Sequence, residues 1–211
     1  MVGKGVLLEC LDDARVVSVL AVGRSVCGVR HAKLTELPHA DFEHWDAVRD
    51  RFAGCDACFY CLGVTSAGTT EAVYRRITYD YTVAAANAVL AAAPQAVFCF
   101  VSGAGADSTE RSRIMWARVK GEAENAVLRM AFRGVYVFRP SLIQPVRGVR
   151  SRTGWYTAFY TIAAPFLPLM LRLAPAHVTT SSRVGRAMLD VAARGFPERV
   201  LHSRDINRLT A

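Results

Sequence analysis

The sequence predicts an α/β protein built on an open parallel sheet flanked by helices. Short apolar runs alternate along the chain with longer stretches of helical period, which is the pattern of that fold class. Several of the apolar runs close on a glycine, which often ends a strand. The 211 residues are 52% hydrophobic and 21% charged, which suffices to bury one good-sized core. We therefore expect a single domain over residues 1–211.

The expected elements follow one another along the chain. Residues 1–10 have the pattern of a helix already under way, with two glycines in its first turn. The apolar runs predict strands over 15–24, 33–38, 56–64, 96–107 (with its loop), 134–140 and 198–202. Helical periods predict helices over 44–52, 81–94 and 113–132. We expect residues 1–140 to form a ligand-binding core, and residues 141–211 to form a small helical cap with the last strand.

The formal charge of +8 and the pI near 9.5 point to an anionic partner, such as a phosphate-bearing cofactor, an acidic membrane surface or nucleic acid. The arginines are scattered, apart from Arg147, Arg150 and Arg152. No recognition-helix motif, zinc-finger spacing or aromatic-rich basic strand accompanies them. We therefore expect no nucleic-acid partner.

An uncharged stretch over residues 155–171 raises the question of whether the chain enters a membrane. About 20 apolar residues are needed to cross a bilayer, and Pro165 and Pro168 would break a helix near its middle. The segment is therefore interpreted as a buried or interfacial helix pair. Peripheral membrane contact is the minority interpretation, supported by the basic residues that precede the segment.

Three of the six cysteines, Cys55, Cys58 and Cys61, have a spacing that resembles a metal site. They lie in an apolar strand run, where Cys58 and Cys61 point to opposite faces, so three thiolates could not converge on one ion. We therefore expect buried thiols and no metal. The absence of a secretory signal and of a regular disulfide framework predicts a reducing compartment, which we assign to the cytoplasm.

Sheets of this kind bind their ligands at the carboxyl ends of the strands, where the strand order reverses. The residues at the predicted strand ends are Gly23, Arg24, Asp41, Phe42, Leu62, Gly63, Val64, Ser102, Gly103, Arg139 and Pro140. Each has a structural explanation of its own, because glycine often ends a strand and Asp or Ser often caps a helix. Taken together they indicate a ligand site.

Six segments, VGKGVLLECL, LAVGR, FYCLG, FVSGAGAD, RVKGEAENAV and FRP, occur in an order and at a spacing that resemble an atypical short-chain dehydrogenase/reductase. The resemblance covers almost the whole chain and is to the NAD(P)-binding branch near the Tat-interacting-protein-like and epimerase/dehydratase-like members. It implies a Rossmann-like, doubly wound parallel sheet. Such proteins begin with a short strand and a Gly-x-x-Gly-x-x-Gly loop, and Gly3 matches the last of these glycines. We expect an N-terminally incomplete sheet, with Met1 an internal methionine of that loop; a shortened protein is the alternative.

The resemblance also implies how the cofactor is held. Arg24, at the end of the second family strand, favours NADP, since an arginine there accommodates the 2′-phosphate and an acidic residue would select NAD. A solvent-exposed arginine with no ligand is the alternative, and NAD stays open. By the same resemblance Asp41 and Phe42 flank the adenine, and Leu62 to Val64 run beside the ribose and the diphosphate.

The family's reductases use a Ser, a Tyr and a Lys, the last two spaced by four residues and therefore side by side on a helix. Ser102 and Lys120 match, and Lys120 would also hold the ribose. The tyrosine position is Trp116, whose indole N–H does not exchange a proton near neutral pH. Tyr156 or Tyr160 from the cap, or water, could replace the missing acid.

Two functions remain open. One is an NADP-dependent oxidoreductase or epimerase-like enzyme, acting on a small carbonyl or sugar-like substrate beneath residues 141–180. The other is a non-catalytic protein that senses NADP(H), which Trp116 favours. A remnant that binds no cofactor follows if the chain begins at Met1. The resemblance also leaves open a homodimer formed through long helices.

Overall fold

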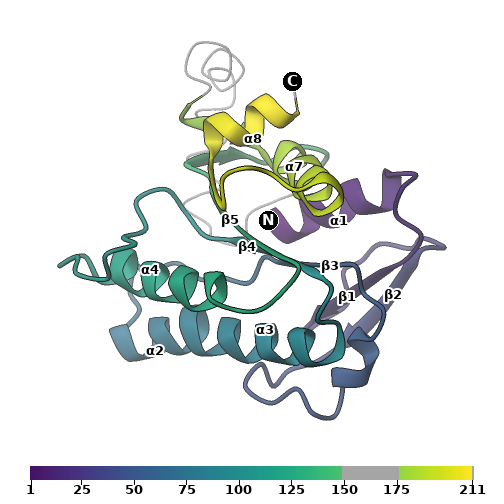
Figure 1. Cartoon of the computed structure of the whole chain (residues 1–211), viewed down its shortest axis with the longest axis horizontal. Coiled ribbons are helices and arrows are strands. Elements are labelled where there is room, and N and C mark those ends of the chain that lie inside the picture. Colours follow the sequence, from purple (N-terminus) through teal and green to yellow (C-terminus); the bar gives the residue numbers. More distant parts are fainter. Residues whose placement is uncertain (149–175, 211) are drawn as a thin grey trace. The chain divides into compact units, whose positions relative to one another are not determined.

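The computed structural model describes residues 1–148 and 176–210. They form a mixed α/β structure with parallel strands, which confirms the predicted fold class (Figure 1). The chain divides into two compact units. Unit 1 comprises Met1–Ala40, Pro140–Asp190 and His202–Ala211, and unit 2 comprises Asp41–Arg139 and Val191–Leu201. The units are described one at a time, and one cofactor-binding domain over 1–211 remains a prediction.

Unit 1 contains the amino-terminal helix and two pairs of parallel strands. Its elements are α1 (Val2–Asp12), β1 (Val19–Gly23), β2 (Leu34–Pro38), β6 (Leu142–Gln144), β7 (Val178–Thr180), most of α7 (Ser181–Arg194) and α8 (Ser203–Leu209). β1 pairs with β2, and β6 pairs with β7. The predicted helix at the start of the chain and the predicted strand over 33–38 are confirmed, and the strand predicted from residue 15 begins only at Val19.

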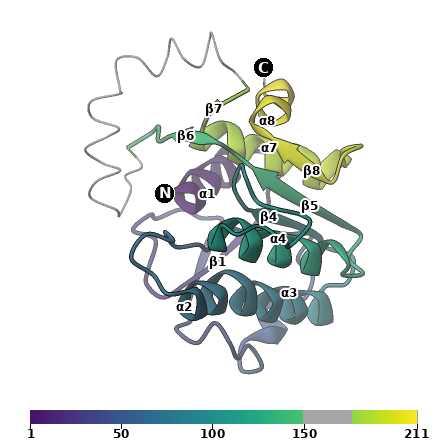
Figure 2. The ribbon, with the colours of Figure 1, turned by 90° about the vertical axis from the view of Figure 1, so that its left-hand side faces the viewer.

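Helices α1 and α7 lie side by side and approach each other closely at two glycines (Figure 2). A Cβ added to Gly5 would lie 2.7 Å from the Cβ of Ser181. A Cβ added to Gly185 would lie 3.1 Å from the Cα of Val6. Because neither glycine has a side chain, the two backbones pack without a spacer between them.

A buried carboxylate links the same two helices. Glu9 of α1 binds Arg186 of α7 (Oε2 to Nε, 3.0 Å) and Arg147 (Oε1 to Nη1, 3.0 Å), and Arg147 also binds Asp12 at 2.6 Å. These carboxylates raise the pKa of Arg147. The arginine cluster noted in the sequence is thus partly neutralised within unit 1, and Arg150 lies outside the described residues.

Unit 2 contains the larger sheet, in the order β3-β4-β5-β8. Its elements are η1 (Arg49–Phe52), β3 (Ala57–Tyr60), α2 (Glu71–Arg75), η2 (Arg76–Asp80), α3 (Tyr81–Ala92), β4 (Val97–Val101), α4 (Met115–Leu128), β5 (Gly134–Arg139) and β8 (Val200–His202), whose last residue belongs to unit 1. β3, β4 and β5 are parallel, and every residue of β4 is buried. Helices α3 and α4 pack against each other beside this sheet (Figure 1).

The strand order agrees with the predicted sheet. Doubly wound sheets of the dinucleotide-binding type have the order 3-2-1-4-5-6. In unit 1 the pair β2-β1 is a parallel neighbour pair of the kind that begins this order, and in unit 2 β3, β4 and β5 follow one another as its later strands do. Within the described residues, β1 pairs with β2 alone and β3 with β4 alone.

Two predicted elements differ from the structure. The helix predicted over 44–52 is only the 3₁₀ helix η1, because the Asp41 carboxylate accepts the N–H groups of Glu43 and His44 and holds the preceding residues in a turn. The helix predicted over 81–94 is confirmed as α3, and it is preceded by α2, where the side chain of Thr70 caps the N–H of Val73. The cap predicted to be helical contains the short strands β6 and β7.

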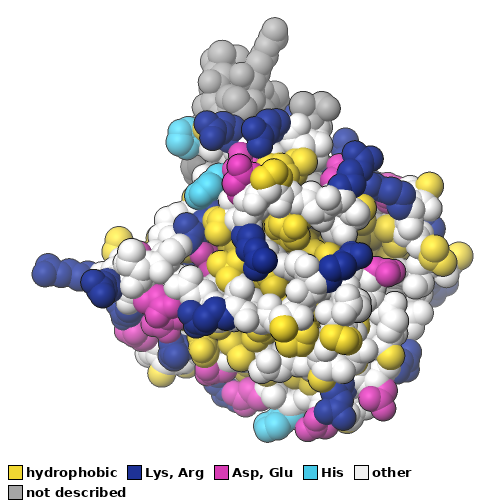
Figure 3. Space-filling model, in the orientation of Figure 1, with side chains coloured by type: hydrophobic (Ala, Val, Ile, Leu, Met, Phe, Trp, Pro, Cys, Tyr) yellow, Lys and Arg dark blue, Asp and Glu magenta, His cyan; other side chains and the backbone are white. Residues whose placement is uncertain are grey.

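The uncharged segment 155–171 lies outside the described residues. Among the helices that are described, none combines the length and the apolar character needed to cross a bilayer. Lys and Arg side chains on the face shown in Figure 3 are distributed among acidic and apolar ones.

Candidate functional site

Ser102 directly follows β4, the buried central strand of unit 2. Its N–H donates to the carbonyl of Phe138 at 2.8 Å, which extends the pairing with β5 by one residue. Its side-chain oxygen is buried and has no hydrogen-bond partner among the described residues. An unsatisfied buried hydroxyl costs about 1–3 kcal/mol, and such groups in native structures often belong to sites that bind a ligand. The predicted site residue thus carries a hydrogen-bonding group without a protein partner.

The loop that follows Ser102 is fixed against α4. The N–H of Asp107 donates to the carbonyl of Ala117 at 2.9 Å. A Cβ added to Gly121 would overlap the carbonyl oxygen of Asp107, so this contact requires glycine. The Asp107 carboxylate accepts from the side chain and the N–H of Thr109 and from the N–H of Ser112, which lowers its pKa to about 2. These contacts therefore hold the backbone of the loop in place against α4.

Trp116 occupies the first turn of α4, and its indole lies against this loop. A Cβ added to Gly105 would be 2.9 Å from Cη2 of the indole. Gly105 also has a φ of +90°, which glycine alone adopts readily. The ring at the tyrosine position of the family is thus held in contact with the loop, and it contributes no proton-exchanging group.

Lys120 lies one helical turn after Trp116 on the same face of α4. Its Cε is 4.0 Å from the position of a Cβ on Gly103, and its Nζ is 5.8 Å from the ring centroid of Phe100. Burial lowers the pKa of Lys120 to about 8, and the charge of Glu124 opposes this shift. The structure therefore places Lys120 beside the residue that follows Ser102, as the spacing of the family predicts.

A buried ion pair, which the sequence analysis did not predict, lies one turn further along α4. Glu124 is fully buried, and both of its carboxylate oxygens are 3.0 Å from Nε of Arg139, the last residue of β5. A closer contact from Nη2 of Arg139 completes the pair, and the same nitrogen donates to Oγ of Ser108 at 2.6 Å. The sequence analysis names Arg139 only as the end of a strand. Glu124 could have been noticed because it follows Lys120 by four residues and so shares its helix face.

The predicted adenine-flanking residues lie in unit 2, before η1. The carboxylate of Asp41 is exposed and accepts from Nδ1 of His44 at 2.9 Å, which lowers the pKa of Asp41 and raises that of His44. Phe42 is buried in an aromatic cluster: its ring stacks on Tyr81 with centroids 5.8 Å apart and meets Trp45 edge-on at 5.6 Å. The contact of either residue with adenine remains a prediction.

The segment from Leu62 to Val64 follows β3 at its carboxyl end. Gly63 and Val64 are exposed, and a Cβ on Gly63 would have no atom within 4 Å. This segment therefore offers accessible backbone at the same edge of the sheet as Ser102. Its contact with a ribose or a diphosphate remains a prediction.

The other predicted cofactor residues, Gly3 and Arg24, lie in unit 1. Gly3 is in the first turn of α1. Arg24 directly follows β1, is exposed, and forms no ion pair with any described residue. Its guanidinium is therefore free to bind an anion such as a phosphate.

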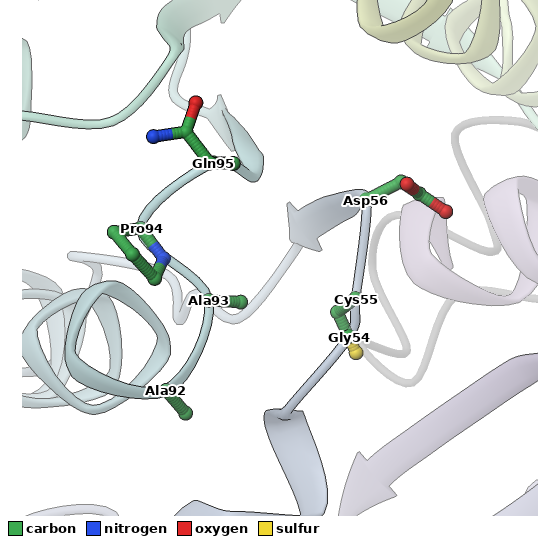
Figure 4. A pocket seen from close by; sticks show the side chains of 7 residues that line it. All are labelled: Gly54, Cys55, Asp56, Ala92, Ala93, Pro94 and Gln95. Carbon is green, nitrogen blue, oxygen red and sulfur yellow. The ribbon is translucent and has the colours of Figure 1, made fainter.

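Two hollows of unit 2 lie away from these residues. One, of about 270 Å³, is lined by Cys55 and Asp56 before β3 and by residues 92–95 before β4, at the amino ends of the strands (Figure 4). Burial raises the pKa of Cys58 to about 12, which keeps its thiol protonated. Nowhere in residues 1–148 or 176–210 do three His, Cys, Asp or Glu side chains gather as metal ligands would.

Comparison with curated proteins finds relatives named FMP52, and no family model matches the chain. Protein FMP52-1, mitochondrial, of Scheffersomyces stipitis is 27% identical over 140 residues, which are 65% of this chain and 61% of that protein. Protein fmp52, mitochondrial, of Emericella nidulans is 27% identical over 150 residues, 68% of this chain and 63% of that protein. The matches thus span less than two thirds of these relatives.

The prediction of a cytoplasmic location is wrong by this comparison, because the curated relatives are named as mitochondrial proteins. Free cysteines and the lack of a disulfide framework indicate a reducing compartment. They do not distinguish one reducing compartment from another, which is the reason for the error.

Comparison with solved structures identifies the fold. MoeE5 in complex with UDP-glucose and NAD has a TM-score of 0.66 at 15% identity, over 94% of this chain and 71% of that chain. The fold is Rossmann-like. Vestitone reductase from alfalfa gives 0.66 at 16% identity over 94% and 72%, and WbmH of Bordetella bronchiseptica in complex with NAD⁺ gives 0.62 at 14% over 92% and 68%. Two of these three structures contain NAD, and preference for NADP over NAD remains a prediction for this chain.

Proposed function

We propose that this chain binds a nicotinamide dinucleotide in a mitochondrial protein, and that it does so as an oxidoreductase or epimerase-like enzyme acting on a small carbonyl or sugar-like substrate. The observation that carries the proposal is the buried hydroxyl of Ser102, which has no partner in residues 1–148 and 176–210 and lies beside a lysine with a lowered pKa at the carboxyl end of β4. Structural neighbours that hold NAD, and relatives named mitochondrial, support it.

The residues present fit such a cofactor. The ammonium of Lys120 can donate to ribose hydroxyls, and the hydroxyl of Ser102 can donate to a substrate carbonyl or hydroxyl oxygen. The free guanidinium of Arg24 suits the 2′-phosphate of NADP. The cofactor itself supplies or accepts the hydride. What this chain contributes is binding, orientation and hydrogen bonds at the reacting oxygen.

Trp116 favours a second candidate, a protein that binds NADP(H) without turnover. The indole is fixed against Gly105 and cannot act as the general acid. Cofactor binding through Lys120 would survive this substitution. The two candidates therefore share a binding site and differ in whether a proton donor reaches the substrate.

Calorimetric titration of the protein with NADPH and with NADH tests the binding step that the two candidates share. We expect tighter binding of NADPH, and we expect Arg24→Ala to remove about 1.5–3 kcal/mol of that preference, the range for a hydrogen bond to a charged group. Arg30→Ala, which removes another exposed arginine of the same loop, is the matched control and should leave the preference unchanged. Failure of the full-length protein to bind either dinucleotide would refute the proposal.

A further inference from the structure

We propose that Arg139 is a positioning residue for Lys120: by occupying the carboxylate of Glu124, it keeps the Lys120 amine unpaired and available to a ligand at the end of β4. The functional meaning of this arrangement rests on the proposed dinucleotide site. The electrostatic arrangement itself does not, and it can be tested without any cofactor.

The carboxylate of Glu124 is fully committed to Arg139. Each oxygen lies 3.0 Å from Nε, Nη2 makes a closer contact, and the Glu124 side chain is 1% exposed. Planar pairing of a guanidinium with both oxygens of a carboxylate is the strongest geometry for such a pair. Ser108 accepts a further hydrogen bond from Nη2, which fixes the guanidinium from the other side.

Lys120 is the next cation along the helix face. It precedes Glu124 by four residues, a spacing at which a lysine and a glutamate are neighbours on a helix surface. It forms no ion pair with the described residues, and its Nζ instead lies over Phe100. Without Arg139, Lys120 is the cation on the same face of α4 that interacts with the buried carboxylate and could neutralise it.

No other charge in the described structure competes for Lys120. β4 and α3 carry no charged side chain, Asp80 of η2 is exposed, and the Asp107 carboxylate is held by its own loop. The remaining charged groups on α4 and its neighbours are paired elsewhere: Arg118 with Glu71, Glu122 with Arg75, and Arg76 with Glu43. Lys120 therefore responds mainly to burial and to Glu124, as the causes of its lowered pKa indicate.

Two substitutions at the ion pair should move Lys120 in opposite directions. Arg139→Met leaves a buried, unpaired carboxylate, which favours the charged form of Lys120 and raises its proton affinity by about tenfold or more. Glu124→Gln removes the negative charge and lowers the proton affinity, because burial then acts unopposed. If the pair were purely structural, both variants would lose stability, but the proton affinity of Lys120 would not shift in opposite directions.

The chain has only three lysines, Lys4, Lys33 and Lys120, which makes the measurement direct. Reductive methylation with ¹³C-formaldehyde gives each amine one resolved NMR signal that still titrates, and Lys→Arg variants assign the signals. The Lys33 amine, which donates to the carbonyl of Asp13 at 2.8 Å in unit 1, is an internal control that should not change.

We expect the wild-type Lys120 signal to titrate near pH 8, to shift up in Arg139→Met and down in Glu124→Gln, and to return to the wild-type value in Arg139→Lys. An unchanged Lys120 in both variants, or shifts of the same sign, would overturn the inference. If Arg139→Met does not fold, Glu124→Gln and Arg139→Lys decide alone: the first must shift Lys120 down and the second must match the wild type. Loss of dinucleotide binding in the wild-type protein would refute the proposed function only.

Discussion

Replacing Gly121 by alanine tests how closely the loop after β4 must approach α4. In an open helix the change would stabilise the protein by about 1 kcal/mol, because alanine is the better helix former. Here the new methyl group would overlap the backbone oxygen of Asp107 and lie 3.3 Å from the N–H nitrogen of Ser108. Backbone atoms cannot rotate away as a side chain can, so the loop itself must move.

The expected loss combines two effects. Overpacking of this kind costs about 1–3 kcal/mol, and displacement of the loop breaks the 2.9 Å hydrogen bond from Asp107 to Ala117, which is worth about 1 kcal/mol. After the helix-propensity gain is subtracted, we expect Gly121→Ala to be about 2 kcal/mol less stable. For a chain of this length, that corresponds to a Tm lower by about 4–8 °C.

Urea and thermal unfolding followed by circular dichroism measure this difference. Gly63→Ala is the matched control, because a methyl group there meets no atom within 4 Å and should change stability by less than about 0.5 kcal/mol. A Gly121→Ala protein as stable as the wild type would show that the loop is not held on α4, and that the placement of Lys120 beside Gly103 does not depend on this contact.

Three further predictions concern the site. If the site is catalytic, Trp116→Tyr should give measurable reduction of small carbonyl substrates with NADPH. If the site only binds the dinucleotide, the variant should show no gain in turnover. A spectrophotometric assay of NADPH oxidation distinguishes the two results. Ser102→Ala should raise stability by about 1 kcal/mol while weakening substrate-dependent turnover, because it removes an unpartnered buried hydroxyl; a loss of stability on unfolding in urea would contradict this. The lowered pKa of Lys120 means that the unfolded chain binds more protons than the folded one between about pH 8 and the ordinary lysine pKa of 10.5. The stability of the wild type should therefore rise with pH across this window relative to that of Lys120→Met. Parallel curves of stability against pH for the two proteins would refute the shift.

Much of the fold could be predicted because buried parallel strands are written as short apolar runs. β4 and β5 lie within the predicted ranges for this reason. The helical period over 44–52 was misleading because a side chain, Asp41, captures the local backbone donors, and periodicity does not report that competition. The three-residue strands β6 and β7 are too short to leave a pattern.

The candidate site was predictable only in part. The sequence placed Ser102 at the end of a strand, where the structure has it, and matched Lys120 only through the resemblance; the structure adds that its Cε lies 4.0 Å from the position of a Cβ on Gly103. The lowered pKa of Lys120 and the missing partner of Ser102 depend on burial, which the sequence does not give for single atoms. Glu124 was overlooked because a charged residue inside a helical period suggests a solvated face, and only the register with Arg139 reveals that it is buried.

The close crossing of α1 and α7 has a consequence for the order in which the chain can fold. Unit 1 is assembled from three separate stretches, and its first helix contacts a helix that begins only at Ser181. During synthesis the glycine face of α1 therefore stays uncovered until α7 has been made, whereas β3, β4 and β5 come from one continuous stretch. Contacts between distant parts of a chain form slowly, so residues 41–139 should become protected from proteolysis before residues 1–40 do. A nascent chain stalled before Ser181 would leave the amino-terminal helix exposed to chaperones and proteases.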